Sequence, residues 1–285
     1  AAIEGREEDV MGAGAAAADP KLDDLLAPEL LTLPLRALLK KSADALDAAY
    51  AVDPKTMRAV VLPQESAHVQ RELEQLAERF GIMGLEVLAS PAIGPQALPM
   101  AGMPPRLIVG TELLEHPDPA LRDFLLVRAL KIIQANACTL SRTSPIDLWP
   151  TLAGYLSVFA PNWQAPNIDA KKLGEARDRV QRAITRRLDD DVPVLALEVI
   201  GSIGNRASQV ATAIHQWGDH VALLAIGSPV TAFSAIALAS GQAQPPAEGP
   251  DRLKGILRNP EARDLAVFSV SEQYAAARQQ VGLDG

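Results

Sequence analysis

Apolar residues recur at helical spacing along most of the chain. Between residues 66 and 81 they fall at i, i+4, i+7, i+8 and i+11, and a glycine follows where helices commonly end in a left-handed cap. Similar spacing predicts helices over residues 33–50, 171–188 and 206–225. This pattern favours a fold built mainly from helices with one apolar face.

Short apolar runs without a helical period occupy the region between these helices. They are rich in Val, Leu and Ile and are bounded by Pro or Gly, which is typical of strands. We expect strands at 57–62, 85–89 and 106–110, and a surface loop over 90–104, which holds four Pro and two Gly. The sequence therefore predicts an α+β, mostly helical chain with a small β-sheet packed on a helical bundle.

These elements divide the chain into one predicted domain and a leading segment. The domain covers residues 21–285, with N-terminal helices at 21–54, the sheet-containing part at 55–115 and a helical part at 116–285. Residues 1–20 open with a stretch containing Ile-Glu-Gly-Arg, the recognition sequence of a protease used to cut fusion tags, and continue as an Ala- and Gly-rich stretch without period. We interpret them as a tag remnant and a flexible linker, within a piece of a longer protein.

Residues 221–240 hold no charged side chain over 20 positions, the length of a membrane-spanning helix. Gly227, Ser228 and Pro229 interrupt this stretch in its middle, and they would break the backbone pairing that a lipid environment demands. We therefore expect two buried helices joined by a tight turn, and no membrane span.

Composition narrows the class of protein. With 48% hydrophobic residues the chain can bury a large core, and its net charge of −8 argues against a nucleic-acid-binding surface, which needs a basic face. The single cysteine, Cys138, lies beside an apolar helix and cannot form an internal disulfide. We interpret it as a small core residue of a cytoplasmic protein.

The stretch from Pro104 to Ala137 joins the predicted elements in a distinctive order. A strand leads to a short amphipathic piece ending at His116, then a Pro-Asp-Pro turn, then an apolar helix. This order resembles the gluzincin metallopeptidases, in particular the family that includes the HtpX-type membrane proteases. In that family an edge strand that can pair with substrate precedes a helix carrying H-E-x-x-H, whose two His bind zinc and whose Glu acts as general base. The resemblance implies a zincin-like fold and a peptide-binding edge strand formed by Arg106, Leu107, Ile108, Val109 and Gly110.

The residues that carry the chemistry of that family are replaced in this chain. Arg128, Ala129 and Ile132 stand at the positions of the first His, the Glu and the second His. The family takes its third ligand from a Glu in E-x-x-A-D, and the matching segment here has His215 at the Glu position and Asp219 at the Asp position. Because a catalytic zinc needs three protein ligands, the resemblance implies a vestigial site that holds no metal and no cofactor.

The same resemblance suggests what replaces the metal. In the family the motif Asp lies near the first His of H-E-x-x-H, so Arg128 would stand beside Asp219. We hypothesise that the two side chains form a bidentate ion pair that ties their helices together.

The function that we expect is that of a non-catalytic, pseudopeptidase-like domain serving as a protein-binding or assembly module. Its protein partner and its oligomeric state are open. Two alternatives remain at this point. One is an active metal-dependent hydrolase with a relocated site that also draws on His68 or His116, and the other is a helical scaffold domain unrelated to peptidases.

Overall fold

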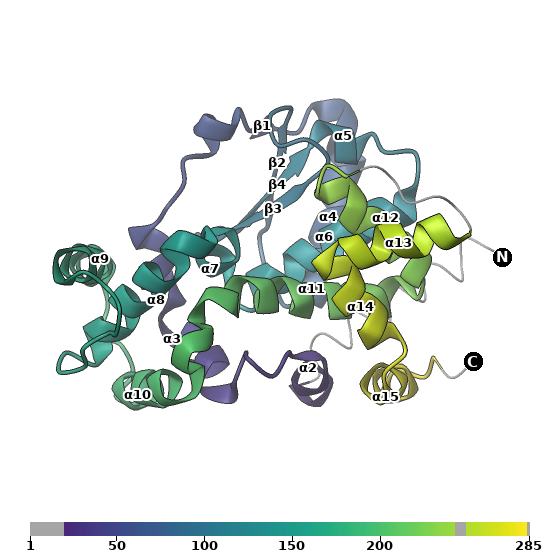
Figure 1. Ribbon diagram of the computed structural model, residues 1–285. Helices are drawn as coiled ribbons and strands as arrows, with labels where there is room; N and C mark the ends of the chain where they lie inside the picture. The colour runs from purple at the N-terminus through teal and green to yellow at the C-terminus, as the bar shows by residue number, and fades with distance from the viewer. Residues whose placement is uncertain (1–19, 243–248, 284–285) are drawn as a thin grey trace.

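The computed structural model describes residues 20–242 and 249–283 (Figure 1). The chain is 66% helical and contains a small four-stranded mixed sheet, so the prediction of a mostly helical α+β protein is confirmed. The linker predicted over residues 1–20 lies outside the described residues, except for Pro20, which begins the first helix.

The sheet has the strand order β1-β2-β4-β3. At its centre β2 (Glu86–Ser90) and β4 (Arg106–Gly110) pair in parallel. They are flanked by β1 (Val60–Val61) and β3 (Ala97–Met100), which pair with them in antiparallel fashion. Both edges of the sheet are therefore short strands.

The two faces of the sheet are buried in different ways. Leu107 and Val109 belong to the main core, which the sheet shares with the helices. Leu88, Met100 and Ile108 form a smaller cluster on the other face, and partly buried apolar side chains pack against it: Val52, Met57, Ala59, Ile93 and Leu98. Because successive side chains of a strand point to opposite faces, a strand buried on both faces needs a continuous apolar run, as β4 has.

The structure corrects the prediction of the edge strand. We expected Arg106–Gly110 at the edge, but β4 lies between β2 and β3, and both its backbone edges are paired. The free edge on that side belongs to β3, which lies inside the stretch 90–104 predicted to be a loop. With four residues, one of them Pro99, β3 lacks the β-branched alternation by which a strand is recognised.

Two buried helices form the centre of the helical layer, α6 (Pro119–Gln134) and α11 (Val210–Ile226). They approach each other so closely that a Cβ atom on Gly218 would lie 2.9 Å from Cγ and 3.0 Å from the carbonyl oxygen of Arg128. Only glycine fits this crossing without moving a helix, because a side chain there would meet backbone.

The uncharged stretch 221–240 forms two helices joined by a tight turn, as predicted. Gly227, with a φ of 68°, ends α11 in a left-handed cap, and Ser228 caps α12 (Pro229–Ala239) by accepting a hydrogen bond from the backbone N–H of Thr231. Within the described residues no helix combines the length and apolar character needed to cross a membrane.

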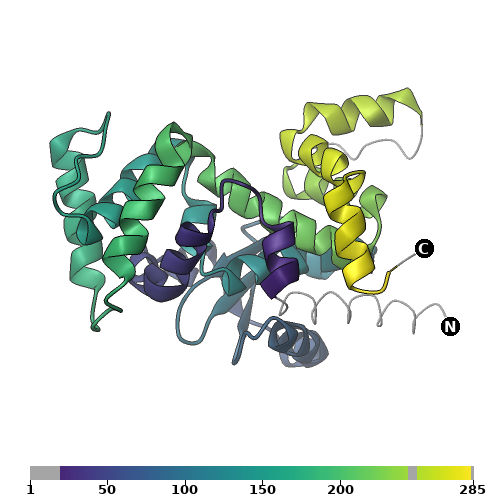
Figure 2. The same cartoon turned by 90° about the horizontal axis from the view of Figure 1, so that it is seen from below.

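The remaining helices surround this centre. Their bounds are α2 (Pro20–Leu26), α3 (Leu33–Ala49), α4 (Ala67–Arg79), α5 (Thr111–Leu114), α7 (Cys138–Arg142), α8 (Pro145–Phe159), α9 (Ala170–Ala183), α10 (Val192–Ile203), α13 (Pro250–Arg258), α14 (Pro260–Ser269) and α15 (Glu272–Gln280), with short 3₁₀ turns at Pro54–Met57, Gln64–Ser66 and Gly204–Gln209. Figure 2 shows α13–α15 gathered at one end of the molecule and α8–α10 at the other, with α11 running between the two groups.

The N-terminal helix α2 is held against the centre by polar contacts in the interior. The ammonium group of Lys131, which is 1% exposed, donates a hydrogen bond to Asp23 and lies 3.7 Å from the centroid of the Trp217 ring. Burial lowers the pKa of Lys131 to about 8, although the neighbouring Asp23 opposes this shift. His220 donates from Nδ1 to the carbonyl oxygen of Leu26 at 2.8 Å.

Candidate binding cleft

The structure brings four of the five residues predicted as a vestigial site to one cleft. Arg128, Ala129 and Ile132 line it from α6, and His215 lines it from α11. The fifth, Asp219, is 2% exposed and contacts Arg128 from inside the protein. The cleft has a volume of about 290 Å³.

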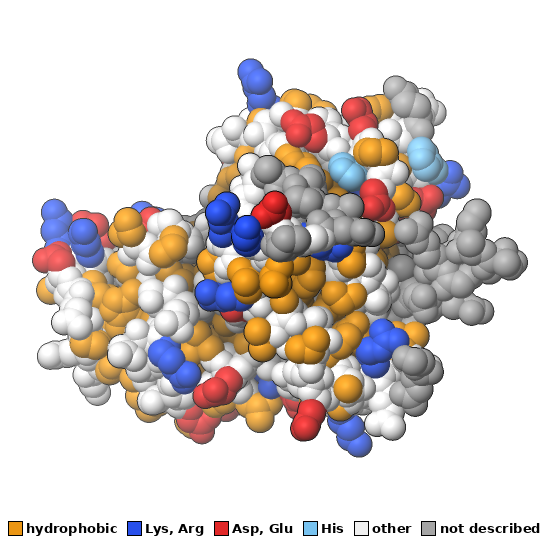
Figure 3. All heavy atoms as spheres, turned by 45° about the vertical axis from the view of Figure 1, so that its right-hand side comes forward, with side chains coloured by type: hydrophobic (Ala, Val, Ile, Leu, Met, Phe, Trp, Pro, Cys, Tyr) orange, Lys and Arg blue, Asp and Glu red, His pale blue; other side chains and the backbone are white. Residues whose placement is uncertain are grey.

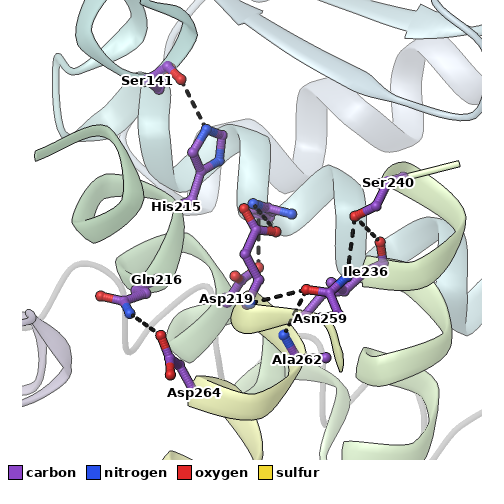
Figure 4. Close-up of polar contacts among 12 residues, drawn as sticks. Ser141, His215, Gln216, Asp219, Ile236, Ser240, Asn259, Ala262 and Asp264 are labelled. Atoms are coloured by element: carbon purple, nitrogen blue, oxygen red, sulfur yellow. Dashed lines mark hydrogen bonds and ion pairs between the residues drawn. The ribbon is translucent and has the colours of Figure 1, made fainter. Parts of the chain in front are cut away.

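The strand β3 lines the cleft together with α6, which it contacts. Gln96 fixes the start of this strand by donating from Nε2 to the carbonyl oxygen of Ala239 at 2.9 Å, at the end of α12. Side chains from α6, α7, α11, α12 and α14 and from the chain around β3 line the cleft. The lining residues are Gln96, Ala97, Leu98, Pro99, Leu125, Arg128, Ala129, Ile132, Ser141, Arg142, His215, Ala239, Ser240 and Glu261. In Figure 4, Ser141 and Ser240 lie on opposite sides of the view, so the cleft extends from the end of α7 to the end of α12.

Arg128 joins three helices through two carboxylates. Its Nε atom lies 3.2 Å from Oδ1 of Asp219 on α11, and its Nη2 atom donates to Oε2 of Glu261 on α14, also at 3.2 Å. The contact with Asp219 is an ion pair without hydrogen-bond alignment, because Oδ1 has no hydrogen-bond partner. The hypothesis of a bidentate pair is thus corrected: the guanidinium divides between two carboxylates, since the first turn of α14 brings Glu261 to its other side.

Burial and charge act against each other in this cluster. Burial raises the pKa of Asp219 to about 7, with Arg128 opposing the shift and Glu261 adding to it. Burial also disfavours the charged form of Glu261, but the charge and hydrogen bond of Arg128 outweigh it and hold the pKa of Glu261 below its ordinary value. Near neutral pH, Arg128 is therefore balanced mainly by Glu261 and in part by Asp219.

His215 is a neutral side chain that connects α11 to α7. Its Nε2 atom donates to the carbonyl oxygen of Ser141 at 2.9 Å (Figure 4), so its other nitrogen, Nδ1, carries the lone pair. That nitrogen is buried without a hydrogen-bond partner. Burial, assisted by the charge of Arg128, lowers the pKa of His215 to about 4.

The residues present do not fit a catalytic zinc. From α6 the cleft receives Arg128, Ala129 and Ile132, none of which is a zinc ligand. The lining side chains of a ligand type are His215, through Nδ1, and Glu261, which is already bound by Arg128, and a catalytic zinc needs three. Across the described ranges 20–242 and 249–283, no three His, Cys, Asp or Glu side chains are grouped so that they could hold a metal ion.

The remaining histidines lie apart from the cleft. His220 stacks on Phe268 with ring centroids 3.6 Å apart, and burial lowers its pKa to about 4. His68 is exposed, and His116 contacts the backbone of Asp118 before α6. The relocated metal site considered above would need these side chains beside His215.

Two cleft residues, Glu261 and Arg142, escaped the sequence analysis. The sequence does contain a signal for the first: Asn259 and Pro260 begin α14, where Asn259 accepts hydrogen bonds from the N–H groups of Glu261 and Ala262, so a carboxylate in the first turn was visible. Nothing in the sequence indicates that this turn faces α6. Arg142 carries no local signal at all.

Comparisons with known proteins give no match. No protein-family model, no curated protein and no solved structure matches it. The resemblance to gluzincins therefore rests on the order and spacing of the elements along the sequence.

Proposed function

We propose that this chain is a non-catalytic, peptidase-like module that binds an extended segment of a partner protein in the cleft along β3. The observation that carries this proposal is the outer edge of β3, which pairs with no other strand in the described ranges 20–242 and 249–283. It lies beside the positions where the resemblance expects zinc ligands, here occupied by Arg128, Ala129 and Ile132. A zincin-like architecture, with a sheet edge over one helix and a second helix crossing beneath, is part of the proposal.

The strand register defines what the edge of β3 offers. The N–H of Gly110 donates to the carbonyl oxygen of Gln96, and antiparallel pairs alternate, so the backbone groups of Leu98 also face β4. The N–H and C=O of Ala97 and the C=O of Pro99 consequently face outward. A partner segment added to this edge would form backbone hydrogen bonds with these groups, as in other cases of strand addition.

Pro99 limits the edge without closing it. Its nitrogen faces outward, where the missing N–H costs no bond within the sheet, and proline on an edge strand restrains indiscriminate pairing with other strands. Ala97 is then the single outward N–H donor between Ala97 and Met100. An edge with one outward N–H donor is better suited to binding a specific segment than to pairing with any exposed strand.

The electrostatic surface is consistent with a protein partner. Figure 3 shows acidic and basic side chains interspersed over the face in view, without a continuous basic area of the kind that nucleic acids require. Cys138 is buried, as expected for a core residue, and we infer a cytoplasmic location from its being the only cysteine.

The experiment is a fluorescence-polarisation titration with fluorescein-labelled degenerate octapeptides. Ala97→Pro removes the outward N–H and should weaken binding about tenfold or more, since the hydrogen bond and the strand geometry are lost together. Ala97→Gly retains the N–H and is the matched control. Equal affinities of the two variants, each shown to be folded by circular dichroism, would refute strand addition at β3.

A further inference from the structure

The charged side chains that line the cleft are balanced within the protein, with one exception. Arg128 is occupied by Asp219 and Glu261. The hydroxyl groups of Ser141 and Ser240 donate to carbonyl oxygens within their own segments, at 2.9 and 2.7 Å. The charge of Arg128 is thus compensated by two carboxylates, and both hydroxyl protons are already donated within the protein.

Arg142 is the exception. Its Nη2 atom donates to the carbonyl oxygen of Tyr50 at 2.7 Å and to Oγ1 of Thr139 at 3.0 Å. An arginine has further N–H groups on Nε and Nη1, and within the described part of the chain these form no hydrogen bond and no ion pair. The guanidinium is thus held in place on one side while its remaining donors are available to the cleft that it lines.

Asp47 shares the partner Thr139 with Arg142 but forms no ion pair with it. Asp47 accepts from the backbone N–H and the hydroxyl group of Thr139, at 3.1 and 2.6 Å. Thr139 therefore stands between the two charges. A guanidinium that is anchored but lacks a directly bonded carboxylate favours an external anion, because charge-assisted hydrogen bonds are about twice as strong as neutral ones.

Arg142 lines the same cleft as the residues of β3. It follows Ser141 at the end of α7, a helix that contacts β3. Ser141 lies on the opposite side of the view in Figure 4 from Ser240, which follows Ala239, the residue that Gln96 binds. An extended segment on the outer edge of β3 would lie between these two ends. One end of such a segment would therefore come to Arg142.

From this arrangement we infer that the cleft recognises a carboxylate of the bound segment, with Arg142 as its anchor. The carboxylate belongs either to an Asp or Glu side chain or to the C-terminus of the partner. This inference rests on the proposed function, because it assumes an extended segment along β3.

The test uses octapeptide pools in three forms: with Glu at each position in turn and an amidated C-terminus, with Gln at those positions and an amidated C-terminus, and with Gln and a free C-terminal carboxylate. The wild-type protein should bind one of the two carboxylate forms about tenfold or more tightly than the neutral form, the strength of one charge-assisted hydrogen bond. The form preferred identifies the source of the carboxylate.

Arg142→Gln should abolish this preference, and Arg142→Lys should retain part of it because the charge remains. Arg187→Gln, at a side chain that is 88% exposed, is the control and should leave it unchanged. A preference that persists in a folded Arg142→Gln protein, or equal binding of all three pools by the wild type, would overturn the inference. The Ala97→Pro variant separates the two proposals: if it weakens all pools while Arg142→Gln changes nothing, strand addition stands and the carboxylate anchor fails.

Discussion

Removing Arg128 should destabilise the protein more than removing either of its partners. Arg128→Met leaves Asp219, at 2% exposure, without a cation, and leaves Glu261, at 32%, with water as its alternative. Asp219→Leu leaves Arg128 paired with Glu261. The two single changes are therefore unequal although they break the same ion pair.

The magnitudes follow from burial. Leaving one member of a buried pair uncompensated costs about 3–5 kcal/mol, which is the loss of unfolding free energy expected for Arg128→Met at about pH 8. Asp219→Leu should cost about 1–3 kcal/mol, since the buried guanidinium of Arg128 loses one of the two carboxylates that balance its charge. The double variant should cost less than the sum of the two, because apolar side chains then face each other.

The pH dependence distinguishes this explanation from lost packing. The pKa of Asp219 is raised to about 7 in the folded protein, against 3.8 when unperturbed, so this group favours the folded state fully below about pH 3.8 and loses that contribution as the pH rises through about 7. At about pH 5 the carboxyl group of Asp219 is protonated, so Arg128→Met no longer leaves a buried negative charge without a cation. Its cost should fall to about 2 kcal/mol or less, the loss of the Glu261 contact.

The assay is urea denaturation followed by circular dichroism, at both pH values, for the wild type, the two single variants, the double variant and Arg187→Met. Arg187 is the control because its ion pair with Asp190 is almost fully exposed. If Arg128→Met costs no more than Arg187→Met, or costs the same at both pH values, the reasoning about a buried pair is wrong.

Two further predictions concern the fold around the cleft. Gly218→Ala should cost about 1–3 kcal/mol in urea denaturation because its Cβ would meet the backbone of α6, whereas Gly174→Ala, on α9 with nothing within 4 Å of its Cβ, should be neutral or stabilising by about 1 kcal/mol or less; equal effects would contradict the close helix crossing. His220 has its pKa lowered from 6.5 to about 4, so its contribution is present above about pH 6.5 and lost as the pH falls through about 4. As the pH falls from about 6.5 to about 4, the unfolding free energy of the wild type should decrease by up to about 3 kcal/mol more than that of His220→Phe, measured by urea denaturation. Unfolding free energies that change with pH in parallel in the two proteins would contradict this prediction.

The periodic elements were predictable because their signal is local. The helix α4 and the pair α11 and α12 follow from apolar spacing and from glycine and proline at their ends. β3 was not predictable, because a four-residue strand containing Pro99 gains its structure from pairing with β4 and carries little strand preference of its own. The same omission placed the sheet edge on the wrong strand.

The cleft was predictable only in part, for a similar reason. Arg128 and Asp219 were paired through a family resemblance that aligned two helices far apart in sequence. Glu261 and Arg142 join them through the docking of α14 and α7, which local pattern does not encode. Lys131 is a related case: a lysine within an apolar helix is expected to reach solvent, and it is buried here because Asp23 and the Trp217 ring compensate its charge.

The proposal that the residues matching gluzincin zinc ligands line a binding cleft without metal is tested most directly by the metal content of protein purified without chelator. Plasma mass spectrometry should find far less than one equivalent of zinc per chain, because Arg128, Ala129 and Ile132 offer no ligand. About one equivalent of zinc, retained after dialysis and lost in His215→Ala, would contradict the claim and restore a metal-dependent activity as the leading hypothesis.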